Sequence, residues 1–187
     1  MAVIHATTMS PSKLELLAGW LPRQSWYEEP ADAELARAGG FRLDDPEGEV
    51  GIEFMVVRAA LAAYLVPMTY RGAPLDGAEH ALIGTSEHGI LGTRWIYDGT
   101  QDPVLVAQFS ALLAGTAEPQ AQGQSDTADP TVHSVPARQP GATVGLRRAL
   151  VATDEDTARE LIKDGGLSAT WVLSSGERVR GVFASPA

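Results

Sequence analysis

Two apolar runs near the middle of the chain constrain its fold more than any other feature. In residues 50–56 and again in residues 64–70, apolar side chains recur at every second position. The side chains that share a face in each run are Val50, Ile52, Phe54 and Val56, then Tyr64, Val66, Met68 and Tyr70. A period of two is that of a half-buried β-strand, and the short segment between the runs predicts an antiparallel hairpin.

Pro67 restricts the second strand of this hairpin. Proline has no backbone N–H and therefore cannot donate a hydrogen bond to a neighbouring strand. We expect this strand to lie at an edge of the sheet or to carry a bulge.

Capping residues and apolar spacing predict several short helices. The expected N-caps are Ser10 before Pro11, Asp102 before Pro103, and Thr153 before three acidic residues. Another helix is expected over residues 31–38, and the glycine pair at residues 39–40 is expected to end it.

Further strands are expected on both sides of this central region. They cover residues 3–6, 82–83, 93–97 and 144–151, and a closing hairpin of residues 167–173 and 178–183. Residues 84–89 are expected to form a loop that joins two strands. Strands mixed with a few short helices predict the α+β class, with a mainly antiparallel sheet and a small α/β or β-hairpin C-terminal extension.

Composition divides the chain into three parts. Residues 116–130 contain no large apolar side chain, so we expect a linker or a long surface loop there. We therefore predict a first domain over residues 1–115. Residues 131–187 are expected to form a strand–helix–hairpin segment that packs on it.

Charge and cysteine content exclude several functions. The formal net charge is -10, so the chain lacks the basic face that nucleic-acid binding or an anionic membrane surface requires. There is no cysteine, which excludes disulfides, thiolate metal sites and cysteine nucleophiles. The first residues do not resemble a signal peptide, and Arg58 and Pro67 interrupt the longest apolar stretches, so we expect a cytoplasmic protein.

Two histidines are the main candidates for metal binding in the sequence. His80 and His88 each follow a glutamate, but their separation matches no zinc-protease spacing. Two polar turns with ordinary hydrogen bonds explain these histidines better, and a metal-dependent enzyme is the less favoured alternative. No metal ligand set, catalytic residue or cofactor is predicted.

Aromatic side chains suggest a second kind of site. The candidates are Trp20, Trp26, Trp95 and Tyr97, whose faces suit stacking on a sugar ring. The same side chains also serve as core anchors in most proteins, so both interpretations stay open.

Four sequence segments, taken in order, resemble one known family. They are residues 41–57 (FRLDDPEGEVGIEFMVV), 64–75 (YLVPMTYRGAPL), 81–85 (ALIGT) and 95–99 (WIYDG), the last followed by Asp102-Pro103. This order resembles the N-terminal cap domain of actinobacterial maltokinases and related aminosugar kinases, over about residues 1–115. The many arginines and only two lysines also suggest a GC-rich bacterial genome. The resemblance implies a curved sheet with helices.

Full-length members of that family join the cap to a kinase whose motifs cannot be matched here. Ile90 follows His88-Gly89 where a catalytic loop would need an acid, and the lysines, Lys13 and Lys163, lie outside any matching strand. We therefore expect a non-catalytic accessory protein rather than an enzyme. We expect its partner to be another protein, an enzyme of trehalose, maltose or glycogen metabolism, or alternatively a small sugar; the oligomeric state is not predicted.

Overall fold

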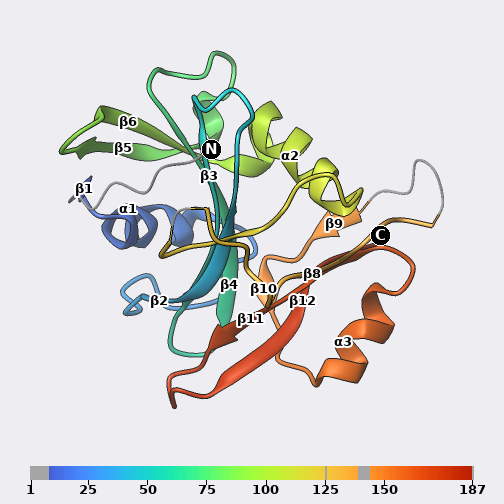
Figure 1. Cartoon of the computed structure of the whole chain (residues 1–187). Helices are drawn as coiled ribbons and strands as arrows, with labels where there is room; N and C mark the ends of the chain where they lie inside the picture. Colours follow the sequence, from blue (N-terminus) through green and yellow to red (C-terminus); the bar gives the residue numbers. More distant parts are fainter. Residues whose placement is uncertain (1–8, 125, 139–143, 187) are drawn as a thin grey trace.

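Antiparallel strands form most of the structure in a computed structural model that describes residues 9–124, 126–138 and 144–186 (Figure 1). Most strands follow one another in a single hydrogen-bonded path. In its order they are β1 (Met9–Ser10), β5 (Leu82–His88), β6 (Gly92–Asp98), β4 (Ala63–Arg71), β3 (Gly51–Arg58), β2 (Ala36–Leu43), β11 (Gly166–Val172), β12 (Arg178–Pro186) and β9 (Val144–Leu146). Short strands pair alongside: β7 (Gln120–Ala121) with β2, β8 (His133–Val135) with β11, and β10 (Ala149–Leu150) with β4.

Short helices flank this sheet. Those in the described residues are α1 (Lys13–Trp20), α2 (Pro103–Leu113) and α3 (Glu155–Ile162), with the 3-10 turns η1 (Leu21–Arg23), η2 (Glu79–Ala81) and η3 (Gly99–Gln101). None of these helices is long and apolar enough to cross a membrane. The predicted α+β class with a mainly antiparallel sheet is confirmed.

The central hairpin forms as predicted, but Pro67 does not lie in an edge strand. β3 and β4 pair from Gly51 opposite Tyr70 to Arg58 opposite Ala63, and β4 has β6 on its other side. On that side β10 pairs with residues 63–64 and β6 with residues 68–71, so Pro67 falls between them. The expected edge position was wrong. Pro67 lies in the gap between the stretches of β4 that pair with β10 and with β6, so no strand on that side needs the N–H that proline lacks.

Both faces of the central strands are buried. One face carries Phe54, which stacks on Phe41 with ring centroids 4.6 Å apart and lies against Phe109 of α2. The other face carries Met55 and packs under Leu17 of α1. In Figure 1 the two helices accordingly lie on opposite sides of the strands.

Two predicted helix starts were wrong by one or two residues, and one was right. α1 is capped by Ser12, whose hydroxyl accepts a bond from the Glu15 N–H, and not by Ser10. α3 is capped by Asp154, whose carboxylate accepts from the Thr157 N–H at 2.8 Å, and the Thr153 N–H donates to the Arg180 carbonyl oxygen of β12. Asp102 caps α2 as predicted.

The helix predicted over residues 31–38 is absent from the described structure, and its last residues begin β2. Its supposed end, the glycine pair, lies within this strand, where the pairing with β3 shifts register after Arg37. Gly40 has a φ of 124°, and a Cβ on it would lie 2.0 Å from the Phe54 carbonyl oxygen. These glycines permit a bulge and close strand contact, and do not cap a helix.

Three other segments differ from expectation or lie outside the description. Residues 84–88 belong to β5 and are not a loop, and Ser86 is anchored there by donating to the Pro11 carbonyl oxygen at 2.7 Å. Residues 144–151 form two short strands, β9 and β10, instead of one. The strand expected at residues 3–6 lies outside the described residues. The closing hairpin is confirmed as β11 and β12.

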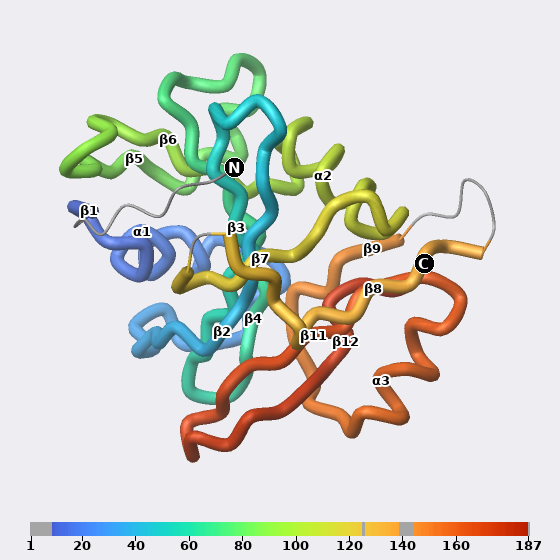
Figure 2. Tube along the Cα trace, in the orientation of Figure 1, coloured from blue at the N-terminus to red at the C-terminus, as the bar shows by residue number. Residues whose placement is uncertain are grey.

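Segments far apart in the sequence join one sheet. β11 meets β2 where Trp171 lies opposite Gly39, and β7 lies beside β2 with Ala121 opposite Phe41. Figure 2 shows the resulting path, in which the last third of the chain returns to the central strands. The sheet therefore contains strands from all three parts into which composition divides the chain.

Replacing Phe54 by alanine tests the central packing. Phe54 is fully buried between β2 and α2, so we expect Phe54→Ala to lower the free energy of unfolding by about 3–5 kcal/mol. Urea denaturation measures this change. Val106→Ala on the exposed side of α2 is the matched control and is expected to change it by less than about 0.5 kcal/mol. A loss below about 1 kcal/mol for Phe54→Ala would contradict this packing.

Candidate functional site

A carboxylate lies in the apolar interior of the sheet. Glu53 of β3 is 4% exposed and shares its face of the strand with the core residues Met55 and Val57. Directly opposite it are Arg42 on β2 and Met68 on β4. A buried charge must be paired and hydrogen-bonded, so its partners define a polar site within this core.

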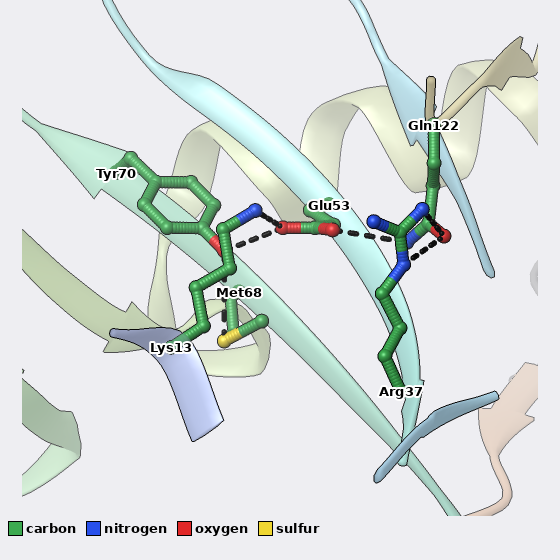
Figure 3. Close-up of polar contacts among 6 residues, drawn as sticks. All are labelled: Lys13, Arg37, Glu53, Met68, Tyr70 and Gln122. Atoms are coloured by element: carbon green, nitrogen blue, oxygen red, sulfur yellow. Dashed lines mark hydrogen bonds and ion pairs between the residues drawn. The ribbon is translucent and has the colours of Figure 1, made fainter. Parts of the chain in front are cut away.

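Both oxygens of Glu53 are occupied (Figure 3). Oε2 accepts from Lys13 Nζ at 2.6 Å and from the Tyr70 hydroxyl at 2.5 Å. Oε1 accepts from Gln122 Nε2 at 2.9 Å. The Gln122 carbonyl oxygen in turn accepts from Arg37 Nε and Nη2 at 3.1 and 2.8 Å, so the amide joins Arg37 to the carboxylate.

Five separate segments supply this site, since Glu53 lies on β3 and Arg37 on β2. Lys13 is the first residue of α1, Tyr70 lies near the end of β4, and Gln122 directly follows β7. The Lys13 ammonium also lies 5.0 Å from the centre of the Tyr70 ring. Sequence analysis missed the site, although an acid inside the apolar run of residues 50–57 was a signal for it.

The protonation states of Glu53 and Tyr70 follow from these contacts. Burial raises the pKa of Glu53, but Lys13, the Tyr70 hydroxyl and Arg37 lower it more, so the carboxyl pKa lies below its usual value. Burial, followed by the negative charge of Glu53, raises the pKa of Tyr70 well above its usual value. At neutral pH Glu53 is therefore ionised, and Tyr70 keeps its proton and donates it.

A second buried carboxylate holds the start of α2. Asp102 is fully buried, and Arg71 grips its two oxygens with Nε and Nη2, both at 2.7 Å. Asp102 also accepts from the Val104 N–H as the helix cap. Burial raises the pKa of Asp102, but the bond from Arg71 and the bond from Val104 bring it below its usual value.

The aromatic candidates separate into two groups. Trp20 and Trp26 lie together, with ring centroids 5.8 Å apart, and Arg148 lies 5.0 Å from the Trp26 ring. Trp95 and Tyr97 belong to a different apolar cluster on β6. Trp20 and Tyr97 are buried in the core, so only Trp26 and Trp95 present part of a ring to solvent.

The two histidines do not come together either. His80 is exposed in η2. His88 ends β5, where its Nδ1 accepts from the Ile90 and Leu91 N–H groups at 3.4 and 3.2 Å and so shapes the hairpin turn. Residues 9–124, 126–138 and 144–186 contain no group of three or more His, Asp or Glu side chains placed to hold a metal ion.

Comparison with known protein families agrees with the sequence resemblance. The family model of the maltokinase N-terminal cap domain matches residues 20–102. This confirms the predicted recognition for that region: residues 20–102 are similar to the maltokinase N-terminal cap domain. The match extends from the end of α1 to the cap of α2, and so includes Glu53, Tyr70 and the Arg71–Asp102 pair. No curated protein matches the chain.

Acid titration tests the buried pair. A carboxyl whose pKa is lowered by folding stabilises the protein above its unfolded-state pKa, and this stability is lost as the pH falls through the folded-state pKa. We expect Glu53→Gln to lower the free energy of unfolding by about 3 kcal/mol at pH 7, because it leaves the buried donors without their anion.

The difference between wild type and Glu53→Gln should begin to shrink as the pH falls below the unfolded-state glutamate pKa of about 4.3, and should be lost only below the lowered folded-state pKa, where both proteins lack the charge. Urea denaturation at several pH values measures it. Glu160→Gln, which removes an exposed surface partner of Lys163, is the control and is expected to change stability little. A difference between wild type and Glu53→Gln that does not depend on pH would contradict the ionised state.

Proposed function

We propose that this chain is a non-catalytic, cap-like accessory protein that acts by binding another protein. The observation that carries the proposal is an exposed apolar hairpin tip within the cap-like region. Ile90 and Leu91, at the turn between β5 and β6, are 62% and 44% exposed and are consecutive in the chain. The match to a cap domain supports a role in contact with a partner rather than in chemistry.

The hairpin is well placed for such contact. Figure 1 shows β5 and β6 extending away from the strands that meet β11 and β12. Apolar side chains gain free energy when a partner removes them from water, at about 25 cal/mol per Å² of buried apolar surface. A few such side chains carry most of the energy of many interfaces, with polar residues around them.

The class of partner follows from the family resemblance. In full-length maltokinases the cap is joined to a kinase, so we propose that this cap-like protein contacts a cytoplasmic enzyme of trehalose, maltose or glycogen metabolism. The residues after the matched segment support an independent role. They form α2, β11 and β12, which pack on and extend the sheet of the cap-like region.

Affinity capture from a native lysate at moderate salt tests this proposal. We expect the wild-type protein to retain a specific partner, and Ile90→Asp with Leu91→Asp to reduce its recovery at least about tenfold. Val151→Asp, at another exposed apolar residue, is the control and should retain the partner. Recovery of no specific protein across several growth conditions, or equal recovery by the tip variant, would overturn the proposal.

A sugar-binding function is the second candidate, and the position of Trp26 favours it. This ring is partly exposed and lies beside the Arg148 guanidinium, and aromatic and charged groups of this kind contact sugars. We expect maltose, trehalose or glucosamine to change the tryptophan fluorescence of the wild type and of Trp95→Phe, but not of Trp26→Phe. A flat response of the wild type to all three sugars would exclude this function.

A further inference from the structure

Arg42 carries two buried hydrogen-bond donors with no acceptor. Its Nε and Nη2 atoms are shielded from solvent and have no hydrogen-bond partner among the described residues. Arg42 lies on β2 between Glu53 of β3 and Gln120 of β7, each directly opposite it in the strand register. The Gln120 side-chain oxygen is also buried and accepts no hydrogen bond within the described structure.

Glu53 does not satisfy Arg42, although it is the nearest acid in the register. Its two oxygens already accept from Lys13, Tyr70 and Gln122. Arg42 therefore lies opposite, in the strand register, a carboxylate whose hydrogen bonds go to other donors. A buried charged donor without an acceptor destabilises the fold, so such groups call for a specific explanation.

Another arginine of the same chain shows what this pair of donors binds. Arg71 uses the same two atoms, Nε and Nη2, to hold both oxygens of Asp102 at 2.7 Å. This planar two-donor geometry matches carboxylate and phosphate groups. In Arg42 the same pair of donors is unoccupied.

The charge around Arg42 also favours an anion. Two cations already serve Glu53, Lys13 through an ion pair and Arg37 through Gln122, and Arg42 lies opposite Glu53 in the register of β2 and β3, although the whole chain has a net charge of -10. Arg42 as a whole residue is partly exposed, but Nε and Nη2 are covered, so a ligand reaches these two donors only by displacing the groups that cover them.

We propose that Arg42 anchors a binding site for a small oxyanion, a carboxylate or phosphate monoester, that also carries a hydroxyl group. The oxyanion accepts from Nε and Nη2 of Arg42, and the hydroxyl donates to the Gln120 side-chain oxygen. Sugar acids and sugar phosphates have this chemistry. The site is independent of the hairpin tip, which is separated from β2 by β4 and β3 in the strand order.

Calorimetric titration of the full chain with defined anions tests the site. The probes are inorganic phosphate, glucose 6-phosphate and gluconate, with neutral glucose and sodium chloride of equal ionic strength as controls. We expect a hydroxylated anion to bind and the two controls not to bind. Whether glucose 6-phosphate or gluconate binds more tightly identifies the oxyanion.

Variants separate the two donors from general charge. Arg42→Gln should weaken binding at least about tenfold, and so should Arg42→Lys, which keeps the charge but loses the planar pair of donors. Arg138→Gln removes an equal charge from an exposed position and should bind like the wild type. Gln120→Met should weaken glucose 6-phosphate binding but not phosphate binding.

Stability without ligand provides a second measurement. Because Arg42 leaves donors unsatisfied, Arg42→Met should unfold at an equal or higher urea concentration than the wild type. The proposal is overturned if no anion binds at millimolar concentration, if Arg42→Gln binds as tightly as the wild type, or if Arg42→Met is strongly destabilised. Failure of the hairpin-tip experiment would leave these results unaffected.

Discussion

Burial of β3 on both faces is the constraint on which the rest of the structure depends. Phe54 faces α2 and Met55 faces α1, so this strand has no solvent-facing side on which to place a charge. Glu53 is tolerated there only because Lys13, Tyr70 and Gln122 bring donors to it. The same contacts hold the start of α1 and the segment after β7 against the sheet, so one carboxylate joins two segments that lie far apart in the chain.

The regions outside the matched segment complete this arrangement. Arg148, far along the chain, donates to Asp98 at 2.5 Å, lies over Trp26, and accepts from the Leu65 N–H through its carbonyl oxygen. It thus contacts three parts of the cap-like region at once. β10 pairs with β4 before Pro67 and β6 pairs with β4 after it, so neither neighbouring strand needs the N–H that proline lacks.

Local sequence signals predicted the elements whose cause is local. The β3–β4 hairpin and the Asp102 cap of α2 follow from alternation and from a capping pair, and both were predicted correctly. The glycines at residues 39–40 were misinterpreted because their role depends on the Phe54 carbonyl oxygen of another strand. The polar site was missed for the same reason: Glu53 meets Lys13 and Gln122 only after the sheet has formed, and no spacing in the sequence encodes that contact.

Arg71 and Arg42 show that the surroundings of an arginine decide what its guanidinium binds. Asp102 is held at the start of α2 by its own capping bond, so it can offer both oxygens to Arg71. Glu53 is shared among three other donors, so Arg42 beside it receives nothing. The Arg71–Asp102 pair stabilises the fold, whereas Arg42 keeps hydrogen-bond donors without acceptors in a partly buried position. Natural proteins keep buried polar groups without partners mainly at functional sites. Arg42 has such groups, whereas Glu53 opposite it is fully paired. Arg42 is therefore the residue that indicates binding.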